Sequence, residues 1–507
     1  MLKKHWQLLL AILIAIHIIV RASEIRWMGY DIIPKAFLDE YNYVWQALSL
    51  KSTGLPVGWV TFEHLYRTPN SLSGNIVDLG IRVGSPDNPV VDLDNFKKQG
   101  KTLIAVRELD WGDGTKHLFF VAPFFDHPPL GGIIFSQSVD KSVNDFADVK
   151  PDQFRRPAVY IAIISSFLLF ILVYLVTNLP WVATLSVAFY SSVPTYLLSS
   201  RIAILENAVP PFALLHLILL TIYLRFQERF TKKITYLILF LSGFAGGLAT
   251  MAKESAIGFV IGSVALILIT GVKEPLKKSK VLLTIIIGAA LPVAWYIIWG
   301  LSIHSKIFLE ILATNASRIS YGPLKLVSTL PALRFKDFPV DGWWLWGFVS
   351  FFLCCLYFNR KYLPLILPFT AHFLLVLFLA SPNYPWYYLA MIPFLASFTA
   401  INLWNLYKTP NIAHAVAFFL IPLSSSFYWG RLVFKGSSNL WDYKITFIVF
   451  MVFVFLKNKF TDNKKVKIVW TIFFIVLTYY LVKLNFQSIQ FIIANWGKLP
   501  IESLPNF

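Results

Sequence analysis

The stretch PAVYIAIISSFLLFILVYLVT, residues 157–177, decides the class of this protein. It holds no charged side chain, and a helix needs roughly 20 apolar residues to cross the hydrocarbon core of a bilayer. A run of this length and composition is typical of a transmembrane helix rather than of a helix buried in a soluble core.

The rest of the chain has the same character. Of its 507 residues, 57% are hydrophobic and only 14% are charged, and the mean hydropathy is +0.63. A soluble protein of this length exposes far more charge, so the composition excludes that class and indicates an all-α polytopic membrane protein.

Apolar runs recur along the sequence and predict about thirteen transmembrane helices. Their approximate bounds are 6–20, 157–177, 181–199, 207–224, 234–251, 255–272, 281–300, 342–358, 362–380, 386–404, 411–429, 444–457 and 467–483. The breaks at Pro180 and at Lys253–Glu254 have two interpretations, because a tight turn between two helices and a kink within one helix give the same pattern.

Positive charges orient the chain, since Lys and Arg are enriched in loops on the cytoplasmic side. With the N-terminus inside, 18 Lys and Arg fall in the N-terminus and the short inner connections. The short outer connections hold five, which are Arg201, Lys253, Arg431, Lys435 and Lys444. We therefore expect a plasma-membrane protein with a cytoplasmic N-terminus and an extracytoplasmic tail from about Lys483. The net charge of +18 reflects these topology signals, and we expect no nucleic-acid partner.

Residues 1–22 have a second interpretation as a cleaved signal peptide. Lys3 and Lys4 precede an apolar core, and Val20-Arg21-Ala22 precedes Ser23, which is the order of regions in such a peptide. In either case the segment that follows lies outside the cell.

Two outer segments are long, the first at about 21–156 and the second at about 301–341. Within the first, NIVDLGIRV (75–83), KTLIAVREL (101–109) and KHLFFVAPFF (116–125) are rich in β-branched and aromatic residues, which predicts a small sheet. The aromatic run GWWLWGF (342–348) is expected to form a belt at the membrane interface rather than a platform for a sugar.

Polar residues cluster at the expected outer helix ends, which makes these ends the candidate site. Asp39 and Glu40 lie in FLDEYNYVW (37–45), just after the first span. Further along the outer face are Asp126-His127, the pair Arg155-Arg156, Arg201 with Glu206, and Lys253.

Three of these motifs, in this order, resemble those of the GT-C fold glycosyltransferases. They are the DE pair at 39–40, DHPPLGG at 126–132 and SSRIAILEN at 199–207. The resemblance is to the protein O-mannosyltransferases, which use dolichyl-phosphate mannose, and to the bacterial aminoarabinose transferases of lipid A. Mannosyltransferases have a lysine where this chain has Gly132, and the family usually has aspartate where Glu206 stands.

The resemblance covers residues 1 to about 405, which it identifies as a transmembrane catalytic module, and leaves 406–507 as additional C-terminal helices with a tail. It implies transfer of a sugar from a polyprenyl-phosphate donor to a protein, lipid or glycan acceptor at the extracytoplasmic face, by an inverting displacement. It also implies that Asp39 is the base, that Glu40 orients it or the sugar, and that Asp126 and His127 shape the donor or acceptor site.

The chemistry of such a transfer fits the remaining polar residues. A departing lipid phosphate is already a stable anion, so the reaction needs a base for the acceptor hydroxyl and cations for the phosphate. Arg201 and Lys253 lie on the side disfavoured for positive charge, so we assign them to that phosphate. Arg155 and Arg156 are weaker candidates, because a basic pair before a helix is often only an anchor, and Glu206 pairs with Arg201 or contacts the sugar.

Alternatives remain open at this point. A divalent ion held by Asp39, Asp126 and Glu206 is one, although no sequence motif marks a metal site and no cofactor is required. The other functions that stay open are a lipid or solute transporter or flippase, and an oligosaccharide transferase or ligase. Transporters usually have ionisable groups near the membrane midplane within inverted repeats, and this sequence has neither feature.

Overall fold

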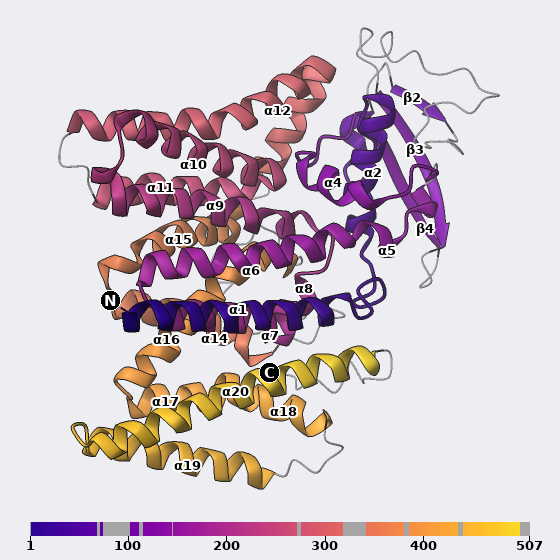
Figure 1. The fold of residues 1–507 in the computed structure, drawn as a ribbon. Coiled ribbons are helices and arrows are strands. Elements are labelled where there is room, and N and C mark those ends of the chain that lie inside the picture. Colours follow the sequence, from indigo (N-terminus) through magenta and orange to yellow (C-terminus); the bar gives the residue numbers. More distant parts are fainter. Residues whose placement is uncertain are drawn as a thin grey trace.

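A computed structural model describes residues 2–67, 71–74, 102–110, 115–143, 146–270, 275–317, 341–379, 385–433 and 440–496. Most helices run alongside one another in a bundle, and a small sheet with short helices covers one end of it (Figure 1). The expected class, a polytopic helical membrane protein with some β structure in its first long loop, is confirmed.

Each of the thirteen expected spans falls on a helical segment. The helices of the bundle are α1 (Leu2–Trp27), α6 (Arg156–Thr177), α7 (Pro180–Ser192), α8 (Pro194–Ser199), α9 (Leu205–Phe226), α10 (Lys232–Ala252), α11 (Ile257–Thr270), α12 (Pro275–Ser317), α14 (Gly342–Leu356), α15 (Leu363–Leu379), α16 (Ile392–Lys408), α17 (Ile412–Phe418), α18 (Ser424–Val433), α19 (Leu440–Lys459) and α20 (Lys464–Ala494). Eight segments of the described chain are long and apolar enough to cross a membrane.

The two ambiguous breaks both separate helices. Helix α6 ends at Thr177, where Asn178 forms a left-handed cap with a φ of 57°, and α7 starts at Pro180. A 3₁₀ turn, η5 (Glu254–Ala256), joins α10 to α11. The Lys253–Glu254 pair therefore lies in a connection at a helix end, not inside a span.

The expected second outer loop is partly wrong. Helix α12 continues through residues 301–317 and changes direction at His304, whose backbone is not helical (φ −160°, ψ 88°). The expected loop was placed where the apolar run ends. Polar residues do not by themselves end a helix, so α12 continues past the apolar run as far as Ser317. Residues 318–340 of that expected loop lie outside the described residues.

A four-stranded sheet forms in the first long loop, in the order β1-β4-β3-β2. Its strands are β1 (Gly58–Val60), β2 (Ser71–Gly74), β3 (Thr102–Asp110) and β4 (Thr115–Ala122). The antiparallel pair β3–β4 contains the two expected strands at 101–109 and 116–125, with Ala105 opposite Phe120. The third expected strand, at 75–83, lies outside the described residues.

Helix α2 (Leu38–Thr53) carries the first acidic pair and packs against the short helix α4 (Leu130–Phe135). Its start is fixed by Glu40, whose carboxylate accepts a hydrogen bond from the Phe37 N–H at 3.0 Å. The acids in the first turn also complement the helix dipole. Gly54 ends the helix with a φ of 70°, a conformation that suits glycine.

The aromatic run at 342–348 is not an interface belt, and that expectation is wrong. Trp343, Trp344 and Trp346 are all buried inside the bundle. The Trp343 Nε1–H donates to Ser426 Oγ at 2.8 Å, so its polar group has a partner within the protein instead of at the membrane surface.

The end of the bundle next to the sheet carries the expected site residues. The C-terminal end of α1, the N-terminal ends of α6 and α9, and helices α2 and α4 all lie there (Figure 1). Segments far apart in sequence thus contribute side chains to one end of the molecule.

Candidate active site

Glu40 is the fully buried centre of a hydrogen-bond network. Arg155, at the N-terminal end of α6, donates to it from Nε to Oε2 at 2.7 Å and from Nη2 to Oε1 at 2.5 Å. The Ala203 N–H, just before α9, donates to the same carboxylate at 2.8 Å. Glu40 therefore ties α2 to α6 and to the start of α9, and it fixes the position of its neighbour Asp39.

Asp39 differs sharply from Glu40 although the two are adjacent. Its side chain is only partly buried, and no described residue hydrogen-bonds to it. Burial raises the pKa of Asp39 to about 6; His127 and Lys253 act to lower it, whereas Asp126 and Glu206 act to raise it. These four side chains are therefore the electrostatic neighbours of Asp39, and they include residues from three distant motifs.

His127 links the DHPPLGG motif to the turn after α10. Its Nδ1 lies 2.9 Å from Glu254 Oε1, and its Nε2 lies 3.6 Å from Asp126 Oδ2. Burial and Lys253 act to lower the pKa of His127, but the two carboxylates outweigh them and the pKa lies above its ordinary value. The Gln46 amide of α2 donates to the His127 carbonyl at 2.9 Å, which holds the motif against α2.

Lys253 is the buried cation of this cluster. Its Nζ lies 3.6 Å from Glu206 Oε1, 3.5 Å from Glu254 Oε1 and 5.1 Å from the centre of the Tyr387 ring. Burial acts to lower the pKa of Lys253, but Glu254 and Glu206 outweigh it and raise the pKa. Lys253 is thus charged and is surrounded by acids on two sides.

We call the group Asp39, Asp126, His127, Glu206, Lys253 and Glu254 the acid–lysine cluster. All of these were singled out in the sequence as site residues except Glu254. Its position beside Lys253 was the available signal, but charge alone did not distinguish it from an anchoring residue. Glu206 pairs with Lys253 and not with Arg201. Of the two roles expected for Glu206, the pair with Arg201 is therefore wrong, and contact with the sugar stays a prediction.

The remaining arginines lie apart from this cluster. Arg155 is committed to Glu40, and its Nη1 donates to the Tyr30 and Pro34 carbonyls at 3.0 and 2.8 Å. Arg156 is exposed and contacts Asp152 and Tyr30. Arg155 therefore has no guanidinium group free for a substrate. Arg156 is exposed to solvent, and its expected role in donor or acceptor binding stays a prediction.

Arg201 is buried beside Arg26 and donates from Nη1 to the Met28 carbonyl at 2.7 Å. Burial, followed by the charge of Arg155, lowers the pKa of Arg201 to about 9. No described contact joins Arg201 to Asp39 or Lys253, so the sequence-predicted phosphate cations lie in two groups.

The described residues contain no group of three or more His, Cys, Asp or Glu side chains arranged to hold a metal ion. Within the acid–lysine cluster, Glu206 and Glu254 contact Lys253, and Asp126 and Glu254 contact His127.

Comparisons with known proteins support the fold. Residues 126–299 match the family described as dolichyl-phosphate-mannose-protein mannosyltransferase. The crystal structure of ArnT from Cupriavidus metallidurans bound to undecaprenyl phosphate superposes with a TM-score of 0.50, at 12% identity, covering 96% of this chain and 77% of ArnT. The chain has the GT-C fold.

The archaeal oligosaccharyltransferase AglB from Archaeoglobus fulgidus, in complex with an inhibitory peptide and a dolichol-phosphate, is a more remote neighbour. It has a TM-score of 0.46 and 11% identity, covering 96% of this chain and 56% of AglB. Another structure of an oligosaccharyltransferase from Archaeoglobus fulgidus has a TM-score of 0.41, and this chain spans 51% of its length. No curated protein sequence matches the chain.

Proposed function

We propose that this GT-C protein is a membrane glycosyltransferase that moves a sugar from a polyprenyl-phosphate donor to an acceptor at the extracytoplasmic surface. The observation that carries the proposal is the environment of Asp39. It is a partly exposed carboxylate, with a pKa raised to about 6, beside a buried lysine and at the end of the bundle where the motifs meet.

In the proposed reaction the acceptor oxygen forms a bond to the anomeric carbon of the donor sugar. The bond from that carbon to the lipid phosphate oxygen breaks, and the phosphate leaves with the bonding electrons. Asp39 takes the proton of the acceptor hydroxyl. Attack opposite the leaving group inverts the configuration at the anomeric carbon.

The other residues of the acid–lysine cluster support this step. Lys253 supplies positive charge near the reacting centre, where fixed charge stabilises a departing anion. Its two acidic neighbours, Glu206 and Glu254, hold its ammonium group in place. Glu40, locked by Arg155, positions Asp39 without taking part in proton transfer.

The donor class is supported by the structural neighbour ArnT, which was crystallised with undecaprenyl phosphate. The match of residues 126–299 to a mannosyltransferase family also favours a lipid-linked sugar donor. The face of the membrane rests on the distribution of Lys and Arg along the sequence.

The test is transfer of radiolabelled sugar from a panel of polyprenyl-phosphate sugars in membranes that contain the protein. Wild type should transfer label, and Asp39→Asn should reduce the rate about 10²–10⁴-fold, as expected for loss of a general base. Asp140→Asn is the matched control, because Asp140 is an exposed acid of the same loop. Equal transfer by wild type and Asp39→Asn would remove Asp39 from its role, and movement of an intact donor across the membrane without transfer would favour a flippase.

A further inference from the structure

Two fully buried arginines lie close together near the end of the bundle that carries the sheet. Arg26 is at the C-terminal end of α1, and Arg201 lies between α8 and α9. Both have a relative exposure of 0%, although they come from segments about 175 positions apart in the sequence. A guanidinium carries five N–H donors and stays charged in proteins, so each needs partners.

The partners present satisfy only part of this requirement. Arg26 Nε donates to Ser200 Oγ at 3.3 Å, and its guanidinium lies 5.5 Å from the centre of the Tyr190 ring. Arg201 uses Nη1 for the Met28 and Arg26 carbonyls. In the described part of the chain, Nη1 and Nη2 of Arg26 and Nε and Nη2 of Arg201 have no hydrogen-bond partner.

The local charge is also unbalanced. The buried carboxylate of Glu40 cannot neutralise the two arginines, because it already forms an ion pair with Arg155. Neither Arg26 nor Arg201 forms an ion pair with any described carboxylate. The charge of Asp31 acts on Arg201, but it is opposed by the positive charges of both Arg155 and Arg26. Buried cations without sufficient counter-charge are strongly unfavourable. Because Asp31 forms no ion pair with either arginine, the pair keeps an excess of positive charge that a bound anion would balance.

We propose that Arg26 and Arg201 bind a phosphate-type oxyanion, either the phosphate of a lipid or free phosphate, at a site separate from the acid–lysine cluster. Guanidinium groups suit this ligand because their fixed forks of donors match the tetrahedral oxygens of a phosphate and form strong charge-assisted hydrogen bonds. The four unpartnered nitrogens are the donors assigned to the ligand.

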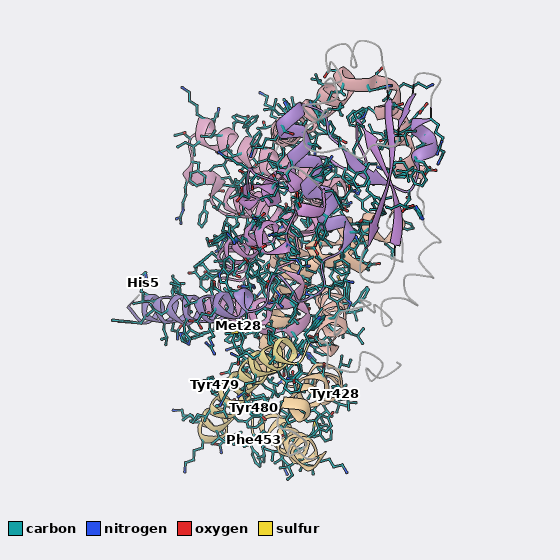
Figure 2. The ribbon with its side chains drawn as sticks, turned by 90° about the vertical axis from the view of Figure 1, so that its right-hand side faces the viewer. His5, Met28, Tyr428, Phe453, Tyr479 and Tyr480 are labelled. Atoms are coloured by element: carbon teal, nitrogen blue, oxygen red, sulfur yellow. The ribbon has the colours of Figure 1, made fainter. Side chains whose placement is uncertain are left out.

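The position of the pair favours a ligand that arrives from the membrane. The carbonyl that Arg201 contacts belongs to Met28, and the side chains of Met28 and Ile32 are 41% and 65% exposed. Figure 2 shows Met28 at the end of α1 that joins the bundle, whereas His5 is at the end that projects from it. One turn of backbone therefore separates the arginine pair from an apolar surface at the end of a span.

The experiment measures thermal unfolding of the purified protein in a neutral detergent, with three probes added separately: inorganic phosphate, a short-chain prenyl monophosphate and phosphatidylglycerol. At concentrations well above its Kd, at least one probe should raise the Tm of wild type by on the order of 2 °C. A response to phosphate alone identifies the free ion, and a response to either lipid identifies a headgroup.

Variants separate a ligand site from a structural role. Arg26→Gln and Arg201→Gln should abolish the shift, and without probe Arg26→Gln should melt no lower than wild type, because it removes an uncompensated charge. Arg156→Gln, at an exposed arginine, should keep the full shift. The probes should still raise the Tm of Lys253→Met even if this variant no longer transfers sugar. The anion site and the proposed transfer reaction can therefore be refuted separately.

The proposal is overturned if none of the probes shifts wild type, or if Arg26→Gln and Arg201→Gln retain the shift. Should the glutamine variants not fold, Arg26→Lys and Arg201→Lys retain the charge but not the fork, and their shift should be reduced at least severalfold at equal probe concentration. Native mass spectrometry tests the site on wild type alone. A bound phosphate or lipid phosphate should appear as an added mass that dissociates from the protein. Absence of any added mass with all three probes would contradict the site.

Discussion

Arg155 holds Glu40 through two parallel hydrogen bonds, with Nη2 2.5 Å from Oε1 and Nε 2.7 Å from Oε2, and both side chains are fully buried. The pair links the first turn of α2 to the start of α6. Because the adjacent Asp39 lacks any comparable partner in the described chain, two neighbouring acids have opposite characters. One is a fixed structural charge, and the other is available for chemistry.

The first prediction concerns the energy of this buried pair. Glu40→Gln or Arg155→Met should lower the free energy of unfolding by about 3–5 kcal/mol, because each leaves one buried charge without its partner. Transfer activity should fall with the folded fraction. Unfolding in detergent, followed by fluorescence, measures the change.

Arg156→Gln is the matched control for this pair. Arg156 is the next residue, but it is exposed and its 3.4 Å contact with Asp152 lies at the surface, where such pairs contribute about 0–1 kcal/mol. Equal losses at positions 155 and 156 would contradict the interpretation of Glu40 as a buried structural charge.

The second prediction is a pH dependence of transfer. Asp39 accepts a proton only when ionised, and its pKa lies at about 6. The kcat/KM of wild type should therefore rise as pH increases through about 6 and then level off. The Asp39→Asn variant should show low activity without this rise, and a wild-type profile that is flat between pH 5 and 8 would exclude Asp39 as the base.

The pH dependence of stability provides an independent check of the same pKa. The ionised Asp39 should destabilise the folded state, whereas an acid in an ion pair would stabilise it. Folding raises the pKa of Asp39 from 3.8 to about 6, so the folded state disfavours the charged form. This cost is fully present above about pH 6 and disappears as pH falls towards 4. Asp39→Asn should therefore raise the Tm at pH 7.5 and leave it unchanged near pH 4.

Much of the fold was predictable because bilayers impose length and polarity on each span. Apolar runs predicted where the bundle helices lie, and β-branched residues predicted β3 and β4. The run at 181–199 forms two helices, α7 and α8, and α20 continues to Ala494, so the expected tail does not begin at Lys483. The tryptophan run at 342–348 was misassigned because a sequence gives the composition of a helix but not the neighbours that cover it. In the structure, Ser426 supplies the partner for the Trp343 indole.

Most residues of the acid–lysine cluster were predictable from the sequence, but Glu254 and the pairing of the charged groups were not. Asp39, Asp126, His127 and Lys253 do meet at one end of the bundle, as their order and topology indicated. Glu206 contacts Lys253 rather than Arg201 because α9 packs against α10, and the sequence does not reveal this packing. Arg26 gave no signal at all, because a basic residue after an apolar run looks like any membrane anchor.

The third prediction separates folding from function at Lys253. Lys253→Met should destabilise the protein by several kcal/mol, because a buried charge left without its partner is strongly unfavourable. Glu206 is buried, and its only described ionic partner is the Lys253 ammonium at 3.6 Å. Adding Glu206→Gln should restore most of the stability. The double variant should remain inactive, because the positive charge near the departing phosphate is still missing.

The measurement is a double-mutant cycle on unfolding, combined with transfer assays normalised to folded protein. A positive coupling energy with no recovery of transfer fits the proposed role. Full activity in the double variant would mean that Lys253 only balances the charge of Glu206 and does not act on the donor.

The fourth prediction explains a departure from the mannosyltransferase pattern. Gly132 stands where those enzymes have lysine, and a Cβ at this position would overlap the carbonyl oxygen of Tyr43 on α2. Helix α4 thus approaches the backbone of α2 directly, and no side chain fits between them. Gly132→Ala should destabilise the protein by roughly 1–3 kcal/mol through overpacking, and Gly132→Lys should destabilise it further instead of improving donor binding.

Gly131→Ala provides the control, because its tightest contact is the end of the flexible Leu205 side chain rather than backbone. It should cost less than Gly132→Ala in the same unfolding assay. The displacement of α2 by Gly132→Ala should also move Asp39, which lies one turn before Tyr43, so transfer should decline even in the folded fraction. A Gly132→Lys variant that folds normally and transfers faster would show that the close approach of α4 to α2 is not required, and that the lysine of the related enzymes can be accommodated here.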